Sequence, residues 1–180
     1  MKQFVTGLVF VSLIGSAPST FAGFFDFQLD GQIGYTNLGH IQHPDTGNEV
    51  TFDGASFGAH GMLKILFIAL IVDYQHFFKE ADLLHVGLGT KLGLPLSVVE
   101  PYVRGSVGLM MLDVAAAAFD PDANNMIDNE LGLHVRAGGG LDVPLGEWFA
   151  VGVSADVGYH YITGEHGYDF SVMGYLGLRI

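Results

Sequence analysis

The chain has 180 residues, enough for one domain, and a formal net charge of −12 at pH 7. Only 14% of its residues are charged, against about 25% in ordinary soluble domains, while 49% are hydrophobic. The acidic balance excludes nucleic acid as a partner, because phosphate binding needs a basic surface. There is no cysteine, so the chain must fold without disulfides.

The first 22 residues have the pattern of a secretory signal peptide. Lys2 precedes an apolar run from Phe4 to Ile14, and small residues follow up to Ala22. The run is shorter than the roughly 20 residues that a transmembrane helix needs. A buried first helix would fit this order of features less well. We therefore expect residues 1–22 to be a signal peptide and residues 23–180 to be the mature, exported domain.

Eight segments of the mature chain alternate between polar and apolar residues. In FDFQLDGQIGYTNLG, which begins at Phe25, Leu29 and Ile33 share one face, whereas aspartates and glutamines occupy the other. A period of two predicts β-strands, because successive side chains of a strand point to opposite faces. The predicted strands are Phe25–Leu38, Thr51–Ile65, Ala69–Phe78, Leu83–Gly93, Pro101–Val114, Leu131–Val143, Phe149–Tyr161 and Asp169–Ile180.

The connections between these strands differ in character at the two ends. LPLSVVEPY and VPLGEWFAV are short links in which Pro95 and Pro144 mark turns, while LFIA at residues 66–69 carries no turn residue. GHIQHPDTGNE, KEAD, AAAAFDPDANNMIDNE and TGEHGY are polar and mostly longer. Short turns at one end and longer loops at the other predict an all-β fold, an eight-stranded antiparallel up-and-down transmembrane β-barrel.

Glycine indicates which face of the strands is inside. A soluble lipocalin-like barrel would enclose the apolar face, whereas a membrane barrel encloses the polar one. The polar face carries many glycines, among them Gly34, Gly58, Gly138 and Gly158. On a solvent-exposed face glycine only weakens a strand, but in a narrow lumen large charged side chains need small neighbours. We therefore expect the polar face inside and the apolar face against lipid.

The polar face predicts a balanced charge network in the lumen, because buried charges require partners. Its expected members are Asp26, Asp30, Lys64, Asp73, Lys91, Arg104, Arg136, Asp142, Asp156 and Arg179. We expect Arg179 to pair with Asp26 or Asp30, since the first and last strands must close the barrel. Four further lumen residues, His60, His85, His134 and His160, lack metal-ligand spacing and are expected to be hydrogen-bonded polar groups.

The opposite face predicts an apolar belt with aromatic edges. The belt is expected to include Phe57, Leu88, Val107, Val135 and Val153. The edges are expected to include Tyr74, Phe77, Trp148, Phe149, Tyr159 and Tyr161.

The signal peptide, the eight strands and the paired turns PLSVVEPY and PLGEWFAV together resemble the small OmpA-type, or porin-family, outer-membrane barrels. The resemblance covers the whole mature chain. It implies a place in the bacterial outer membrane, contact with membrane lipid and lipopolysaccharide, delivery by the barrel-insertion machinery, and a monomer. The chain departs from the family pattern at its last residue, Ile180, where an aromatic ring is usual.

Three functions fit such a barrel. The first is a non-enzymatic protein of the cell envelope with a structural, adhesive or surface-interaction role; the second is a narrow solute or ion channel. The third is a lipid A-modifying enzyme, for which YHYITGEHGYD offers His160, Thr163 and Glu165 but no His-x-Ser arrangement. We therefore expect no catalytic residues and favour the first function.

One loop, DPDANNMIDNE, resembles a calcium-binding sequence. Asp120, Asp122, Asn124 and Asp128 match positions 1, 3, 5 and 9 of an EF-hand loop. The twelfth position is Leu131 instead of the bidentate glutamate. The alternative is a solvated acidic loop. No other cofactor is expected.

The loop end gives the first prediction. Most acidic residues outside the lumen, Asp169 among them, are expected there beside Lys79 as the only basic residue. Since lipopolysaccharide phosphates are also negative, we expect divalent cations to bridge the two and to order the loops. Calcium should raise the melting temperature of the refolded protein above its value in chelator at matched ionic strength. Equal melting, unchanged by Asp120→Asn and Asp122→Asn, would leave only a solvated loop.

Overall fold

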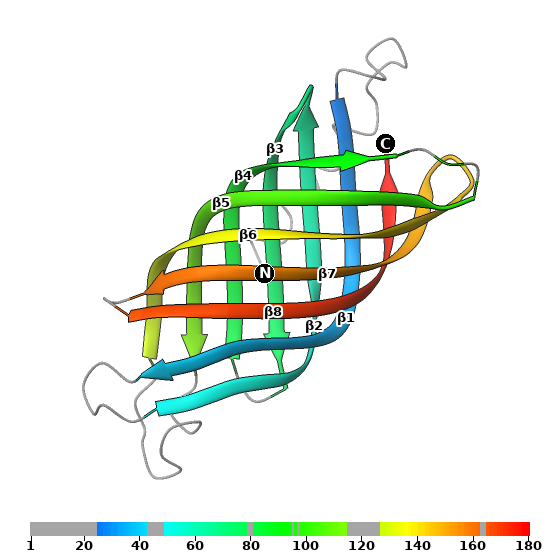
Figure 1. Cartoon of the computed structure of the whole chain (residues 1–180). Coiled ribbons are helices and arrows are strands. Elements are labelled where there is room, and N and C mark those ends of the chain that lie inside the picture. The colour runs from blue at the N-terminus through cyan, green and yellow to red at the C-terminus, as the bar shows by residue number, and fades with distance from the viewer. Residues whose placement is uncertain are drawn as a thin grey trace, which may run out of the picture.

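The computed structural model describes residues 25–42, 49–78, 81–94, 96, 98–114, 127–162 and 165–180. They form a closed antiparallel barrel in which each strand pairs with the next and β8 pairs with β1 (Figure 1). The strands are β1 (Phe25–Gln42), β2 (Glu49–Ile65), β3 (Ile68–Phe77), β4 (Ala81–Gly93), β5 (Glu100–Val114), β6 (Ile127–Leu145), β7 (Phe149–Ile162) and β8 (Glu165–Arg179). The predicted fold class is therefore confirmed, while the expected signal peptide lies outside the described residues.

The first and last strands close the barrel through backbone hydrogen bonds. The Phe27 N–H donates to the carbonyl of Ile180 at 2.9 Å, and the Ile180 N–H donates back to Phe27 at 2.9 Å. The ladder then continues from Gln28 opposite Arg179 to Asn37 opposite Phe170. No open sheet edge remains between β1 and β8, as a barrel in lipid requires.

Strands β1, β2, β4, β6 and β8 extend at least two residues farther toward the loops than predicted. The alternation of polar and apolar residues fades after Leu38, yet β1 continues to Gln42, which pairs with Glu49 at the start of β2. The backbone hydrogen bonds of a sheet do not require alternating polar and apolar side chains. The alternation is needed only where one face of a strand contacts lipid. The sequence therefore located the lipid-facing part of these strands better than their ends.

The turn between β2 and β3 consists of Leu66 and Phe67 alone, since Ile65 pairs with Ile68. Leu66 has a φ of 59°, the only positive φ of a non-glycine residue in the described part of the chain. This left-handed conformation costs about 1–2 kcal/mol for a residue with a Cβ, which is why two-residue hairpins favour glycine or asparagine there. In the turn of three residues between β6 and β7, glycine does take the left-handed position, since Gly146 has a φ of 80°.

Polar side chains fill the interior of the barrel and apolar side chains cover its outside. Gln28, Asp73, His85 and Asp156 are buried, whereas the outward residues of the same strands are exposed. The expected belt is confirmed, because Phe57, Leu88, Val107, Val135 and Val153 are all exposed. An apolar exterior around a charged interior is the polarity of a membrane-spanning barrel. No helix in the described residues has the length and hydropathy to cross a bilayer.

Phe77 corrects one detail of the predicted belt. It was expected among the aromatic residues at the edge, but it points into the lumen and is 2% exposed. It follows Asp73 and Gln75 on the inner face of β3, so the period of two places it inside. It belongs to a buried cluster near the loop end, which we call the apolar plug: Leu38, Phe52, Phe77, Ala81, Leu83, Met110, Leu112, Val114 and Ile162.

Glycines on the inner face make room for particular charged side chains. A Cβ at Gly138 would collide with the carboxylate of Asp156, which lies opposite it on β7. A Cβ at Gly158 would likewise meet the Asp169 carboxylate and His134. By contrast, Gly31 faces outward, with only the Leu176 carbonyl oxygen 4.0 Å from the added carbon. Around the Asp156 and Asp169 carboxylates the lumen thus has no space for a single additional methyl group.

The second prediction compares these glycines. Gly138→Ala should lower the free energy of unfolding by about 1–3 kcal/mol, because overpacking displaces the Asp156 carboxylate. Gly31→Ala is the matched control, and it should be neutral or slightly stabilising. Urea unfolding of the refolded protein in lipid vesicles can be followed through Trp148, the only tryptophan. Equal stability of the two variants would contradict the filled lumen.

Candidate functional site: the barrel lumen

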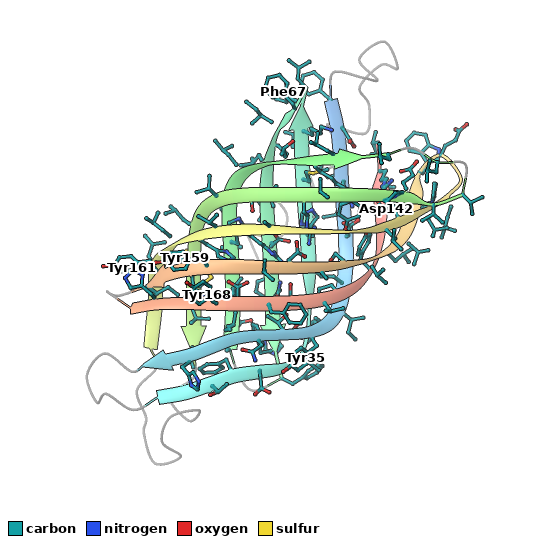
Figure 2. The ribbon with its side chains drawn as sticks, in the orientation of Figure 1. Tyr35, Phe67, Asp142, Tyr159, Tyr161 and Tyr168 are labelled. Carbon is teal, nitrogen blue, oxygen red and sulfur yellow. The ribbon has the colours of Figure 1, made fainter. Side chains whose placement is uncertain are left out.

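The polar groups of the lumen form three layers below the apolar plug. Nearest the short turns is a turn-end cluster of Glu100, Asp142, Tyr175, Lys91 and Arg179. Halfway up is a central network of His60, Asp73, Arg104, Arg136 and Asp156. Toward the loops is a histidine cluster of His85, His134, His160 and Asp169. Figure 2 labels Asp142 near the turn end of the barrel.

Asp142, fully buried on β6, is the centre of the turn-end cluster. Lys91 Nζ on β4 donates to Asp142 Oδ2 at 3.0 Å and to Gln28 Oε1 at 2.9 Å. Arg179 on β8 contacts the same carboxylate through Nη2 and donates from Nη1 to Glu100 Oε2 at 3.0 Å. The cluster therefore ties four strands together across the turn end of the lumen.

Arg179 does not have the partner that was expected. It contacts Asp142 and Glu100, whereas Asp30 accepts a hydrogen bond from Gln28 at 2.6 Å and Asp26 is exposed. Arg179 lies opposite Gln28 in the β1–β8 ladder, and its long side chain reaches across the lumen instead of staying beside β1. The strand pairing was anticipated, but the direction of a long side chain was not.

A cavity of about 120 Å³ lies at this end of the barrel. Its walls include Asp26, Lys64, Glu100, Tyr102 and Arg179. Lys64 Nζ donates to the backbone carbonyl of Lys91 at 3.1 Å, and Lys91 Nζ lies 4.1 Å from the centre of the Tyr102 ring. The cavity is large enough for a few water molecules and ends at the turn-end cluster.

The central network is built on a bidentate ion pair. Arg104 donates from Nε and Nη2 to the two oxygens of Asp156 at 2.7 and 2.6 Å. Arg136 lies between Asp156 and Asp73, at 3.5 and 3.3 Å. Asp73 also accepts from, or shares a proton with, His60 Nδ1 at 2.6 Å. Parallel N–H···O bonds of this kind fix geometry as well as charge, so the network is rigid.

Asp169, a member of the histidine cluster, corrects a second assignment. It was expected among the acidic residues of the outer rim, but it is buried in the lumen. Its Oδ2 lies 2.9 Å from His134 Nε2 and 3.4 Å from His160 Nδ1. Sequence reasoning counted it with the loop. Its spacing of two from Ser171 was the signal that could have placed it inside.

The lumen histidines are joined to one another. His134 Nδ1 lies 3.1 Å from His85 Nδ1, and His85 Nε2 lies 3.3 Å from Ser106 Oγ. A chain of polar contacts thus runs from Ser106 through two histidines to Asp169. Beside Ser106 there is a cavity of only about 10 Å³, which has room for no more than a water molecule. Within the described residues, no group of three or more potential ligands has a metal-binding arrangement.

Two predicted sites lie wholly or partly outside the described residues. Of the calcium loop, Asp120, Asp122 and Asn124 lie outside the described residues, as does the side chain of Asp128. Thr163 and the side chain of Glu165 also lie outside them, so only His160 of that group is described.

Polar contacts on the outer face lie near the loop end. Tyr74 donates to Asp82 Oδ1 at 2.6 Å, and His76 Nδ1 lies 2.9 Å from the same oxygen. On the far side of the barrel, Tyr159 contacts His166, and Figure 2 shows Tyr159, Tyr161 and Tyr168 together at the ends of β7 and β8. Amphipathic rings of this kind occupy the boundary between lipid and water. We call these residues the aromatic zone: Tyr74, His76, Asp82, Tyr159, Tyr161, His166 and Tyr168. The zone marks the outer membrane interface.

No protein-family model and no curated protein matches the sequence. Among solved structures, the chain is similar to Neisserial surface protein A, with 16% identity, a TM-score of 0.53, and coverage of 87% of this chain and 96% of that one. It is also similar to the N-terminal β-barrel domain of OprF from Pseudomonas aeruginosa, with 12% identity, a TM-score of 0.50, and coverage of 86% and 97%. The fold is thus that of the eight-stranded outer-membrane barrels.

The third prediction tests the central network. Asp156→Ala should destabilise the barrel by about 3–5 kcal/mol, because it leaves Arg104 without its buried ion-pair partner and Arg136 with Asp73 alone. Adding Arg104→Met should recover part of this loss. Asp26→Asn, at an exposed position, should change the unfolding free energy by less than about 0.5 kcal/mol. Urea unfolding measures all variants. An Asp156→Ala effect as small as that of Asp26→Asn would rule out the network as a structural element.

Proposed function

We propose that the protein is a non-enzymatic, non-conducting barrel of the bacterial outer membrane with a structural, adhesive or surface-interaction role. The observation that carries this proposal is the filled lumen. Beyond the turn-end cavity, polar side chains occupy the middle of the lumen, and the apolar plug occupies it near the loops. The strands would then serve to hold the loops at the cell surface.

The apolar plug argues against an ion path. Phe52, Phe77 and Leu112 are almost completely buried inside the barrel. An ion passing between them would lose its hydration shell without gaining polar partners, at a cost of many kcal/mol. Between the turn-end cavity and the apolar plug lies the central network, in which Arg104 on β5 forms a bidentate pair with Asp156 on β7.

The outer face gives less support to a lipid A-modifying enzyme. Its histidines His76 and His166 contact Asp82 and Tyr159, in the aromatic zone that anchors the barrel at the interface. The Ser106–His85 contact faces the lumen, beside a cavity too small for an acyl chain. A surface-interaction role needs neither a reactive group nor a substrate cavity.

The partners follow from this proposal. Membrane lipid would contact the apolar belt, and lipopolysaccharide would meet the aromatic zone and the acidic loop end. The barrel would be delivered by the barrel-insertion machinery and would act as a monomer, since the closed β1–β8 ladder leaves no edge for a second copy.

Planar-bilayer recording tests the proposal and is the fourth prediction. The refolded protein should give no conductance steps in a bilayer in which a general porin, the positive control, gives them. Lipid A from cells that express the protein should keep its mass. Steady conductance would favour the channel, and a changed lipid A mass that disappears with Ser106→Ala or His160→Ala would favour the enzyme.

A further inference from the structure

The tip of the β2–β3 hairpin is entirely apolar. Ile65, Leu66, Phe67 and Ile68 are all exposed, Phe67 to 67% and Leu66 to 55%. Figure 2 shows Phe67 at the very end of this hairpin, at the opposite end of the barrel from the aromatic zone. Short turns of membrane barrels lie on the periplasmic side, where water would meet these side chains. The β6–β7 turn differs in carrying the polar Glu147 and a glycine, Gly146, beside the exposed Trp148.

Backbone strain makes the apolar tip harder to regard as incidental. Leu66 holds a left-handed conformation that glycine or asparagine would adopt more easily, as Gly146 does in the β6–β7 turn. A strained residue persists where the surroundings favour its side chain. Leu66 makes the turn conformation less favourable than glycine would. We therefore attribute its presence to a favourable contact of its side chain.

The length of β3 places this tip at the level of hydrocarbon. At a rise of about 3.3 Å per residue and a tilt of about 45°, the 10 residues of β3 span about 23 Å along the membrane normal. The apolar band of such barrels is about 25 Å tall. The 14 residues of β7 span about 33 Å by the same estimate and can cross the band completely.

The other end of β3 is held at the outer interface. Tyr74, His76 and Asp82 form the polar contacts of the aromatic zone there, and Asp82 is 42% exposed. From Tyr74, which lies in this zone, to Phe67 the chain advances seven residues, or about 16 Å along the membrane normal by the same estimate, which is less than the height of the band. The tip is also continuous with the belt, because Leu70 and Val72 continue the outward apolar row toward Tyr74.

We propose that the β2–β3 tip is a lipid-binding anchor, inserted into the acyl-chain region of the periplasmic leaflet. Leu66 and Phe67 would contact hydrocarbon with no strand beyond them, whereas the β6–β7 turn reaches water. The hairpins would then reach different depths in the membrane, and lipid would cover the end of the β2–β3 hairpin. This anchor rests on the membrane location and not on the absence of conductance.

Tryptophan quenching tests the anchor. In a Trp148→Phe background, Phe67→Trp introduces a single reporter at the tip, and Glu147→Trp introduces the matched control in the β6–β7 turn. Both proteins are refolded into phosphatidylcholine vesicles, and their β-sheet circular dichroism is compared with that of the parent. We expect bromine on the acyl chains to quench the Phe67→Trp reporter. Acrylamide should quench it several-fold less than the Glu147→Trp control.

Three results would overturn the anchor. Equal acrylamide quenching at both positions would place the tip in water. Protection from acrylamide without quenching by brominated lipid would show a protein partner, and protection that disappears as the protein is diluted in lipid would identify that partner as a second copy. If Phe67→Trp does not fold, a nitroxide on Phe67→Cys gives the same answer. That label is unique because the chain has no cysteine, and at the tip it should be accessible to oxygen and not to aqueous nickel chelates.

Discussion

The structure depends on the need to neutralise charge inside a narrow barrel that has lipid around it. Arg104, Arg136 and Asp156 cannot turn outward, because the outer face meets hydrocarbon. They must find their partners within the lumen, and several of these ion pairs tie together strands that are not neighbours in the sheet. Arg104 on β5 holds Asp156 on β7, and Lys91 on β4 holds Asp142 on β6. The ion pairs that neutralise charge in the lumen therefore also link these strands to one another.

Glycine is the second half of the same constraint. The carboxylates of Asp156 and Asp169 occupy the space that a Cβ at Gly138 or Gly158 would need. A charged residue on one strand therefore lies beside a glycine on the neighbouring strand, and its side chain fills the space that the glycine leaves open. The apolar plug completes this filling near the loops, where Phe52 and Phe77 replace ions as the large inward side chains. The result is a barrel wall with a packed interior, which is consistent with a protein that works through its ends.

The sequence was informative wherever lipid imposed a repeating pattern. The period of two identified all eight strands and the face of Phe57, Leu88 and Val153, because one face must be apolar throughout. The sequence was less informative about single residues whose placement was judged from their charge, or depends on the length of their side chain. Asp169 was assigned by its charge to the rim although its spacing placed it inside, and Phe77 was assigned by its ring to the belt edge. The partner of Arg179 depends on how far a flexible side chain reaches across the lumen, which no pattern along one strand contains.

The hydrogen bonds between Phe27 and Ile180 also have a consequence for the order of events in folding. The two residues lie at opposite ends of the described chain, so the seam between β1 and β8 has the largest sequence separation in the sheet. Contacts this distant form slowly, because the entropy of closing the intervening loop must be overcome before they contribute. The hairpins can form from neighbouring residues as the chain emerges, but the cylinder cannot shut before β8 arrives. Until then β1 has an unpaired edge, and the interval between export and closure is when the chain is most exposed to aggregation.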